Sequence, residues 1–540
     1  MKNKYILVFI ICQLQFIINA QFLAIPIDYP KISLSGNYAE LRKNHFHMGL
    51  DFRTDNLENI RILAVEDGYI SRMVISPNGY GKALYIHHPQ IGLTTVYAHL
   101  NAFRPDLEWW MSQTQNSKKV NVIDTIFPRP LFYVQKGEHI AFSGNTGSSE
   151  APHLHFEIRN LLTEKTLNPL RYYPQIEDTI APILDKVLFY HCEGESVFIQ
   201  SFSKDEVQKQ TLEFNSGSIG IAVSARDKMN STPNVFGLYA LRVFEDNILK
   251  YQFKLDSLDF RWQSHIKAAS DYGLEMNDVY KGFFENCSFN LSDSGSMNGI
   301  ISINKGENKL IRLEVYDFKG NSNSTEFNLT TTADLVTDKS SQINCLQEQV
   351  LTDGNSFQLI IPAKGLAENY NLNYTIQKLN PNEVFKLNIL DSSVAALKPY
   401  QLSYFIPKDM ADYTKLYLES RVDNKLKTYQ GIVESNVLTF PKLKNYGLMT
   451  IKYDKKNPVI SPDLIRKPNK VIFTVKDVES GIADYQLYVE GMWRRLYYDE
   501  KNNQLIYNII PADKGKKFKA LLEVTDQVGN KNSKNMEILF

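Results

Sequence analysis

Residues 152–158 have the sequence Pro-His-Leu-His-Phe-Glu-Ile. The alternation of polar and apolar residues predicts a β-strand from residue 153 to residue 158, entered from the Gly/Ser/Asn-rich loop 143–152. On such a strand His153 and His155 point to one face, and the apolar residues between them point to the other face, toward a core. Two neighbouring imidazoles indicate a shared task. Either both bind a metal, or one binds it while the other transfers protons.

The pattern of the sequence around this strand is typical of a small β domain. Short apolar or alternating runs are separated by turn signals such as Asp67-Gly68 and Pro77-Asn78-Gly79. The predicted strands before residue 153 are Arg61–Val65, Gly68–Ile75, Ala83–Ile86, Leu93–Ala98 and His139–Phe142. We therefore predict a compact antiparallel β-sheet domain over residues 21–176.

Histidine is concentrated in this domain: eight of the ten histidines lie between His45 and His155. Residues 44–51 have the sequence Asn-His-Phe-His-Met-Gly-Leu-Asp, which places His47 and Asp51 on the same side if the segment is extended, with Gly49 permitting a bend. Together with His155 they offer two imidazole nitrogens and one carboxylate. This set suits one tetrahedral Zn²⁺ per chain, with a water in the fourth position.

A third segment, Val-Tyr-Ala-His-Leu at residues 96–100, adds His99. Hydrolysis at a zinc ion needs a group that takes a proton from water and a donor that stabilises the oxyanion. His153 and His99 are the candidates, because the pKa of imidazole lies near the working pH. The alternatives are a structural metal, a core histidine at position 153 and a purely structural hydrogen bond at position 99.

Other residues near these motifs have simpler explanations. We expect His45 at the surface or supporting the metal site, and His87 and His88 exposed at a strand end. Tyr97 is expected in the core, because aromatic residues on internal strands usually pack there.

Three motifs, His-x-x-x-Asp at 47–51, Tyr-Ala-His-Leu at 97–100 and His-Leu-His-Phe-Glu at 153–157, together resemble the LytM/lysostaphin-type zinc metallopeptidases. They occur in that family's order, and the resemblance covers about residues 35–172. It implies that His47, Asp51 and His155 bind zinc. It also implies that His153 and His99 act in catalysis in an antiparallel β domain with a groove over the metal, and that the substrate is a peptide cross-link of bacterial peptidoglycan.

One departure from the family pattern is an insertion of about 35 residues between His99 and the Lys136-Gly137 turn, where the family has a short link. It contains Trp109 and Trp110. The insertion forms either a groove wall, a lid or a packed element, so it bears on the choice of substrate. In addition, Ser149-Glu150-Ala151 replaces the more usual Thr-Gly pair before His153.

The N-terminus predicts that the chain is exported from the cytoplasm. Lys2 and Lys4 precede an apolar run over 5–18, which predicts a signal peptide over residues 1–20 and export to the periplasm, cell surface or medium. The alternative is a membrane anchor, but the run is shorter than the ~20 residues that a spanning helix needs, and no later stretch resembles one.

The net charge of zero argues against a nucleic-acid partner. In oxidising surroundings one disulfide can form among Cys192, Cys287 and Cys345, which leaves one cysteine over, and we pair Cys192 with Cys287 only because they share a domain.

The rest of the chain is predicted to be β as well, so the fold class is mainly β. Glu-Val-Tyr-Asp-Phe-Lys-Gly-Asn at 314–321 resembles Glu-Val-Thr-Asp-Gln-Val-Gly-Asn at 523–530, and 223–227 resembles 473–477. Such strands, followed by Asp-x-x-Gly-Asn turns, indicate immunoglobulin-like sandwiches over 177–335 and 456–540, with a further β-rich unit over 336–455. The first copy is longer, with extra residues expected within 255–290.

Three functions are compatible with these patterns. The leading hypothesis is an exported zinc endopeptidase that cuts stem peptides or cross-bridges of peptidoglycan. The second is a non-catalytic envelope protein whose C-terminal sandwiches bind a protein partner. The third is a secreted lysin that acts on another organism's wall.

Overall fold

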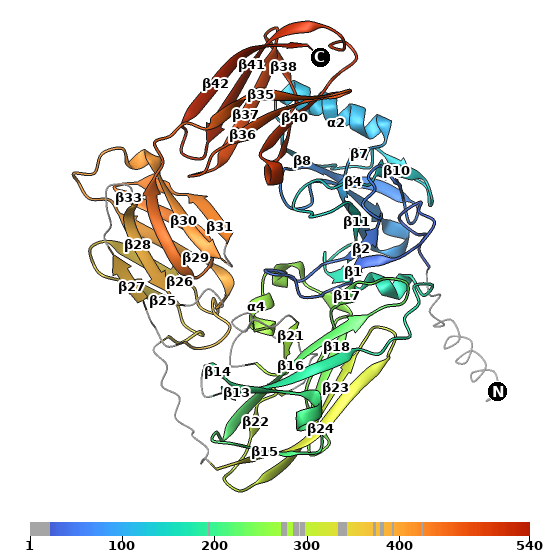
Figure 1. Cartoon of the computed structure of the whole chain (residues 1–540), viewed down its shortest axis with the longest axis vertical. Helices are drawn as coiled ribbons and strands as arrows, with labels where there is room; N and C mark the ends of the chain where they lie inside the picture. Colours follow the sequence, from blue (N-terminus) through green and yellow to red (C-terminus); the bar gives the residue numbers. More distant parts are fainter. Residues whose placement is uncertain are drawn as a thin grey trace, which may run out of the picture.

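The computed structural model describes residues 22–539 except 193–194, 272–277, 285–290, 292–296, 333–342, 371–373, 378–382, 391–393 and 423–424. The predicted signal peptide over residues 1–20 lies outside the described residues. As predicted, the chain is mainly β, with an antiparallel sheet domain followed by three β-sandwiches (Figure 1). No helix among the described residues is both long and apolar enough to cross a membrane.

The first domain is built on one twisted sheet with the strand order β1-β2-β11-β6-β5-β4-β8. Its strands are β1 (Leu34–Gly36), β2 (Leu50–Arg53), β11 (His153–Asn160), β6 (Leu93–Leu100), β5 (Lys82–His88), β4 (Gly68–Ile75) and β8 (Ile123–Ile126). β9 (Tyr133–Val134) pairs with β4, and a small second sheet has the order β3-β10-β7, namely β3 (Arg61–Leu63), β10 (His139–Phe142) and β7 (Ala102–Phe103). The predicted strands are therefore present, with ends that differ by up to two residues.

The insertion after His99 contains a helix that the sequence analysis did not predict, α2 (Pro105–Lys118). Pro105 at its first position and the acidic Asp106 and Glu108 in its first turn are typical of a helix start. Trp110 packs against Phe127 and Phe132, with ring centroids 4.9 and 6.1 Å away, whereas Trp109 is 64% exposed. Packing of the insertion thus accounts for Trp110.

The first sandwich consists of a six-stranded and a five-stranded sheet. The six-stranded sheet contains β13 (Ile183–Cys192), β14 (Ser196–Ser203), β16 (Ser218–Lys228), β17 (Val235–Phe236), β21 (Val279–Lys281) and β22 (Ile301–Ser302). The five-stranded sheet contains β15 (Thr211–Phe214), β18 (Ala240–Glu245), β19 (Ile248–Lys254), β23 (Asn308–Tyr316) and β24 (Ser322–Thr331). Short helices in this part are α3 (Lys204–Val207), η3 (Phe260–Trp262) and α4 (Ile266–Ala269).

This sandwich is continuous with the first domain. β12 (Thr166–Leu167) pairs both with β11 and with β20 (Ser257–Leu258), which comes from the expected extra segment of the sandwich. One hydrophobic core accordingly extends through both units, from Leu23 to Leu329, and also includes Ala395 and Leu397 of strand β29 (Ala395–Phe405) in the next sandwich. The extra segment thus extends the first domain's sheet.

The second sandwich has two five-stranded sheets. Their strands are β25 (Gln349–Thr352), β26 (Phe357–Ile361), β29 (Ala395–Phe405), β33 (Val437–Asn445) and β32 (Ile432–Glu434), and β27 (Tyr374–Gln377), β28 (Glu383–Ile389), β34 (Gly447–Tyr453), β30 (Leu416–Val422) and β31 (Lys425–Gln430). It has a hydrophobic core of its own.

The C-terminal sandwich has two four-stranded sheets with the orders β35-β36-β40-β39 and β38-β37-β41-β42. The strands are β35 (Val459–Lys467), β36 (Lys470–Lys476), β37 (Ile482–Val489), β38 (Met492–Arg494), β39 (Tyr497–Asp499), β40 (Gln504–Asn508), β41 (Lys517–Asp526) and β42 (Lys531–Leu539). Figure 1 shows that the chain curves round, so that this sandwich lies beside α2 of the first domain.

The predicted disulfide between Cys192 and Cys287 is wrong. Cys192 is a buried thiol at the end of β13, whose Sγ lies 3.9 Å from the carbonyl oxygen of Tyr190. Cys345 is the disulfide-bonded residue among the described cysteines. Cys287 lies outside the described residues. Shared membership of a domain is a poor guide to pairing, because a disulfide needs two Cα atoms within about 7 Å of each other.

Candidate metal centre

Strand β11 lies between β2 and β6 and carries two histidines toward the same face of the sheet. The antiparallel register places His155 directly opposite Asp51 on β2 and opposite Ala98 on β6. His99 follows Ala98, so residues from three segments of the sequence meet on three adjacent strands. The prediction that Leu154 and Phe156 face the core is confirmed, since neither side chain is exposed.

The segment before β2 brings His47 to this group. Its backbone forms two hydrogen bonds with a preceding turn, from Ala39 N to His47 O at 2.6 Å and from His47 N to Glu40 O at 3.0 Å. Gly49 is required here for its size: a Cβ atom at this position would lie 2.3 Å from the carbonyl oxygen of Phe156. The absence of a side chain at Gly49 therefore allows the His47 segment to lie against β11.

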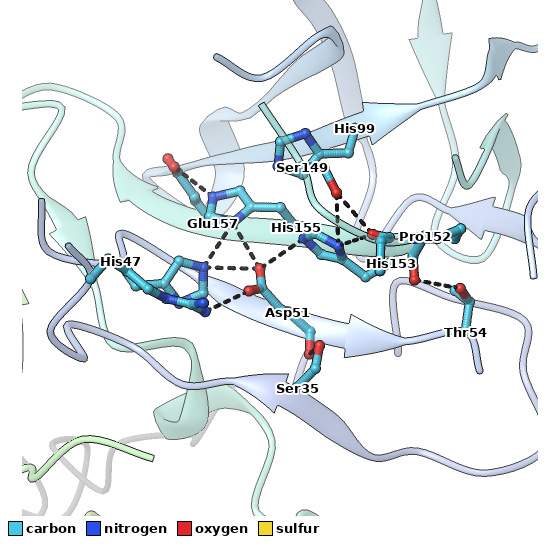
Figure 2. Close-up of polar contacts among 12 residues, drawn as sticks. Ser35, His47, Asp51, Thr54, His99, Ser149, Pro152, His153, His155 and Glu157 are labelled. Atoms are coloured by element: carbon cyan, nitrogen blue, oxygen red, sulfur yellow. Dashed lines mark hydrogen bonds and ion pairs between the residues drawn. The ribbon is translucent and has the colours of Figure 1, made fainter. Parts of the chain in front are cut away.

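The ligand atoms of His47, Asp51 and His155 form a small triangle (Figure 2). His47 Nε2 lies 2.9 Å from Asp51 Oδ1 and 2.9 Å from His155 Nδ1, and His155 Nδ1 lies 3.0 Å from Asp51 Oδ1. Ligands of a tetrahedral zinc ion with bonds of about 2.0–2.1 Å are about 3.3 Å apart, so the sides of the triangle are within about 0.4 Å of the length that such an ion requires. All three side chains are buried.

Hydrogen bonds on the far sides of the two rings orient their free nitrogens. His47 Nδ1 donates to the carbonyl oxygen of Asn37 at 2.6 Å, which leaves Nε2 with its lone pair. His155 Nε2 donates to Glu157 Oε1 at 3.0 Å, so that Nδ1 is the atom directed into the triangle. Three electron-rich atoms thus converge on one point, an arrangement that a cation stabilises.

The electrostatics of the cluster favour positive charge at this point. Burial lowers the pKa of His155, but the carboxylates of Asp51 and Glu157 outweigh it and raise that pKa to about 9. Burial likewise opposes ionisation of Glu157, yet Arg159 and His155 lower its pKa to about 2. The carboxylates are therefore ionised, and the donor set of two imidazoles and one carboxylate fits Zn²⁺.

His153 and His99 lie beside the triangle with their rings 4.9 Å apart (Figure 2). His153 Nδ1 donates to the carbonyl oxygen of Ala151 at 2.8 Å, and its Nε2 lies 3.4 Å from Asp51 Oδ1. His99 has a positive φ of 59° and donates from Nδ1 to the carbonyl oxygen of Thr146 at 2.8 Å. Burial lowers the pKa of His99, which keeps this ring neutral. The structure thus brings all five predicted site residues together.

Two curated proteins are similar to this part of the chain. A DD-carboxypeptidase/endopeptidase, Mpg, of Neisseria meningitidis serogroup B is 32% identical over 148 residues, which are 27% of this chain and 27% of that protein. An uncharacterized metalloprotease of Haemophilus influenzae is 30% identical over 124 residues, 23% of this chain and 20% of that protein. The matches thus span about a quarter of the length of these relatives. No family model matches the chain.

Solved structures of similar proteins include the catalytic domain of the antimicrobial peptidase lysostaphin from Staphylococcus simulans. It is 21% identical, with coverage of 26% of this chain and 92% of that chain and a TM-score of 0.21. Helicobacter pylori Csd3 is 27% identical, with coverage of 28% and 33% and a TM-score of 0.20. This domain resembles the LytM/lysostaphin-type metallopeptidases. The family resemblance inferred from the motifs is confirmed.

This domain also contains supporting residues around the ligands for which the sequence predicted no role. Tyr80 stacks on His155 with centroids 5.3 Å apart and donates a short hydrogen bond to Glu157 Oε1. Arg159 Nε donates to Glu157 Oε2 at 2.8 Å, and Arg42 lies 2.9 Å from Asp51 Oδ2. Glu157 is part of the His-Leu-His-Phe-Glu motif at 153–157, so its position two residues after His155 was the available signal.

Two histidines outside the site were predicted to be exposed at a strand end. His87 is half-buried, but His88 is fully buried, so the prediction for His88 is wrong. Its Nδ1 donates to the carbonyl oxygen of Asp67 at 2.8 Å, and its Nε2 lies 2.8 Å from Thr95 Oγ1. These two partners satisfy the ring nitrogens, which is what makes burial of a neutral imidazole possible.

The C-terminal sandwich contacts the loop that leads to His153. Lys501 Nζ donates to the carbonyl oxygens of Asn145 and Ser149 at 2.8 and 2.7 Å. Gly147 N donates to the hydroxyl oxygen of Tyr497 at 3.1 Å. This loop therefore belongs to the metal-site domain by sequence, but its conformation is supported by the other end of the chain.

A second part of the same interface is formed by the insertion. Asn121 Nδ2 donates to the carbonyl oxygen of Tyr485 at 2.7 Å, and Leu496 N donates to Asn121 Oδ1 at 2.7 Å. Arg495 lies 3.3 Å from Glu108 of helix α2. The insertion is thus a docking surface for the C-terminal sandwich.

Proposed function

We propose that this chain is an exported zinc-dependent endopeptidase that hydrolyses peptide cross-links of bacterial peptidoglycan in the periplasm or at the cell surface. The observation that carries the proposal is the convergence of His47, Asp51 and His155 on one point, with His153 and His99 directly beside it. The names of the similar proteins, an endopeptidase and a metalloprotease, support the same reaction class. Residues 21–176 are taken as the peptidase domain, with residues 1–20 as the export signal.

In this proposal His47, Asp51 and His155 hold one Zn²⁺. When bound, zinc lowers the pKa of a coordinated water toward about 7 and polarises a peptide carbonyl. Glu157 and Asn37 fix the two imidazoles by accepting hydrogen bonds from their outer nitrogens, and Arg42 holds the second carboxylate oxygen of Asp51. Such outer contacts are expected to tune metal affinity.

His153 and His99 have the proton-transfer roles. In each ring Nδ1 donates to a backbone carbonyl, so Nε2 of the neutral imidazole is an acceptor. Because His153 Nε2 lies 3.4 Å from Asp51 Oδ1, beside the ligand set, we assign it to take the proton of the attacking water. His99 is kept neutral by burial in the resting state. The proton that His153 takes from the water passes to His99, whose ring lies 4.9 Å away, and from there to the leaving amine, so that His99 in its protonated form stabilises the oxyanion.

The test is digestion of intact sacculi by the purified full-length protein, with mass spectrometry of the released muropeptides. We expect cross-linked fragments to be cut, with activity lost on chelation and restored by Zn²⁺. His153→Ala should abolish cleavage while zinc remains bound. His87→Ala, the same change in a half-buried histidine outside the site, is the matched control and should retain activity. Intact cross-links after digestion of several wall types would contradict the proposal.

A second candidate function follows from the contact of the C-terminal sandwich with loop 143–152. In that case the sandwiches bind an envelope protein, and the zinc domain serves as a docking or regulatory unit without turnover. The same variant separates the two: a biological effect that survives His153→Ala with zinc bound would favour the binding function.

A further inference from the structure

Two clusters of three aspartates occupy equivalent places in the first and third sandwiches. Asp178, Asp227 and Asp317 form the first, and Asp454, Asp477 and Asp526 form the second; in each, one carboxylate oxygen per residue lies within 4.8 Å of the others. The members correspond: one precedes the first strand of the sandwich, one ends the second long strand, and one begins the Asp-x-x-Gly-Asn turn. The clusters differ in how their charge is compensated.

In the second cluster the charge is satisfied by nearby donors. Ser480 donates both its backbone N–H and its hydroxyl to Asp454 Oδ2, at 3.0 and 2.6 Å. Gly481 N donates to Asp477 Oδ1 at 2.8 Å. Asn530 Nδ2 donates to Asp526 Oδ2 at 2.7 Å, as Asn321 Nδ2 donates to Asp317 Oδ2 at 2.6 Å in the first cluster, so the serine is what distinguishes the two. Hydrogen bonds of this kind stabilise the ionised form of a carboxyl group.

The first cluster lacks the serine. Asn230 takes the position of Ser480, but its Nδ2 donates to Thr179 Oγ1 at 3.2 Å and its Oδ1 accepts from Thr179 N at 3.1 Å. Asp227 is 3% exposed, and its Oδ1 is buried without a hydrogen-bond partner among the described residues. Asp317 is 1% exposed. An unpartnered carboxylate oxygen among two further buried carboxylates is costly unless positive charge is present.

The surroundings supply a small cavity and one nearby cation, Lys319, which also lines that cavity. A cavity of about 10 Å³, the size of one water or ion, borders Asp178 and Asp227. Lys319 is the cation that affects Asp178, yet its Nζ donates to the carbonyl oxygen of Pro174 at 3.1 Å. Burial and the neighbouring carboxylates of Asp178 and Asp317 raise the pKa of Asp227 to about 8. The cluster therefore favours added positive charge, either as a cation or as a proton.

We propose that Asp178, Asp227 and Asp317 bind a hard divalent cation, Ca²⁺ or Mg²⁺, at the junction between the peptidase domain and the first sandwich. Oxygen ligands without nitrogen or sulfur select such ions. The site joins the segment that enters the sandwich to the ends of β16 and β23. The same cavity is lined by Asn37 and Asn168 of the first domain, so the cation would hold the two units together.

The test is thermal unfolding and titration calorimetry of the full chain, loaded with zinc, on addition of Ca²⁺ or of Mg²⁺ alone. We expect a single binding site and a rise of several degrees in the unfolding temperature. Asp227→Asn should lose both the cation binding and the rise in unfolding temperature. This variant should still fold, because the substitution removes a repulsive charge without changing the shape of the side chain. Asp477→Asn, the equivalent change in the second cluster, is the matched control and should retain both.

The response to each ion separates the alternatives. A larger effect of Ca²⁺ or of Mg²⁺ identifies the cation, and retention of the effect in His155→Ala shows that it is distinct from the zinc centre. The proposal is overturned if neither ion binds the wild-type chain, or if Asp227→Asn binds them equally well. A wild-type chain that is stabilised only by acid would likewise overturn it, since a proton would then be the partner of Asp227.

Discussion

Lys501 Nζ lies 2.7 Å from the carbonyl oxygen of Ser149, and the two residues are 352 positions apart in the chain. Ser149 Oγ in turn lies 3.3 Å from Nδ1 of His153. Ser149 therefore links Lys501 of the C-terminal sandwich to His153 of the proposed active site. Loop 143–152 also supplies the carbonyl oxygen of Thr146 that accepts from His99.

Lys501→Ala should therefore reduce turnover by about tenfold, because proton-transfer groups lose efficiency when their support shifts by fractions of an ångström. We expect kcat to fall with little change in KM and with zinc content unchanged. Lys516→Ala, which removes a lysine bonded only within its own turn, is the control. Equal kcat values in the two variants would show that the interface does not position the loop.

The roles of the two histidines on β11 are separable. His155→Ala should lose zinc, because it removes one of three ligands, whereas His153→Ala should keep zinc and lose about 10²–10⁴-fold in kcat. Metal content measured by mass spectrometry, alongside the rate of muropeptide release, tests both. Normal activity in either variant, at unchanged metal content, would refute the assignment.

Glu157→Gln should weaken zinc binding by about 10–100-fold, the usual effect of losing a carboxylate behind a ligating histidine. It should also lower the unfolding temperature, since the guanidinium of Arg159 loses its partner at 2.6 Å. Competition with a chromophoric chelator gives the affinity. Tyr80→Phe removes one hydrogen bond to Glu157 but keeps its charge, so we expect a smaller loss. The opposite ranking would contradict the role of the carboxylate.

The raised pKa of Asp227 predicts a pH dependence of stability. Its carboxyl group has a pKa of about 8 when folded, against about 4 in the unfolded chain, because burial, Asp178 and Asp317 disfavour its charge. Between these values the folded state binds more protons, so its contribution to the free energy of unfolding falls as pH rises from about 4 to 8. Without added Ca²⁺ or Mg²⁺, the wild type should lose stability relative to Asp227→Asn over this range.

Differential scanning calorimetry of both proteins at several pH values measures that difference. A difference that is flat with pH would mean that Asp227 keeps an ordinary pKa. Added Ca²⁺ or Mg²⁺ should remove the slope, because a bound cation takes the place of the proton.

Much of the site followed from local sequence. The alternation in His-Leu-His-Phe-Glu is sufficient to place His153 and His155 on one face and Leu154 on the other, because successive strand residues alternate between faces. Residue types alone then indicated zinc, since two imidazoles and a carboxylate are a zinc ligand set. The repeat of Asp-x-x-Gly-Asn turns likewise predicted β-sandwiches in the C-terminal part.

Only the tertiary structure decided which distant residues meet. The pairing of His155 with Asp51, the burial of His88, the state of Cys192 and the contact of Lys501 with loop 143–152 all depend on long-range packing. Side-chain periodicity is a local property of the backbone, and sequence reveals it directly. Register and docking instead depend on which surfaces together exclude water and satisfy buried polar groups, and no single segment encodes that choice.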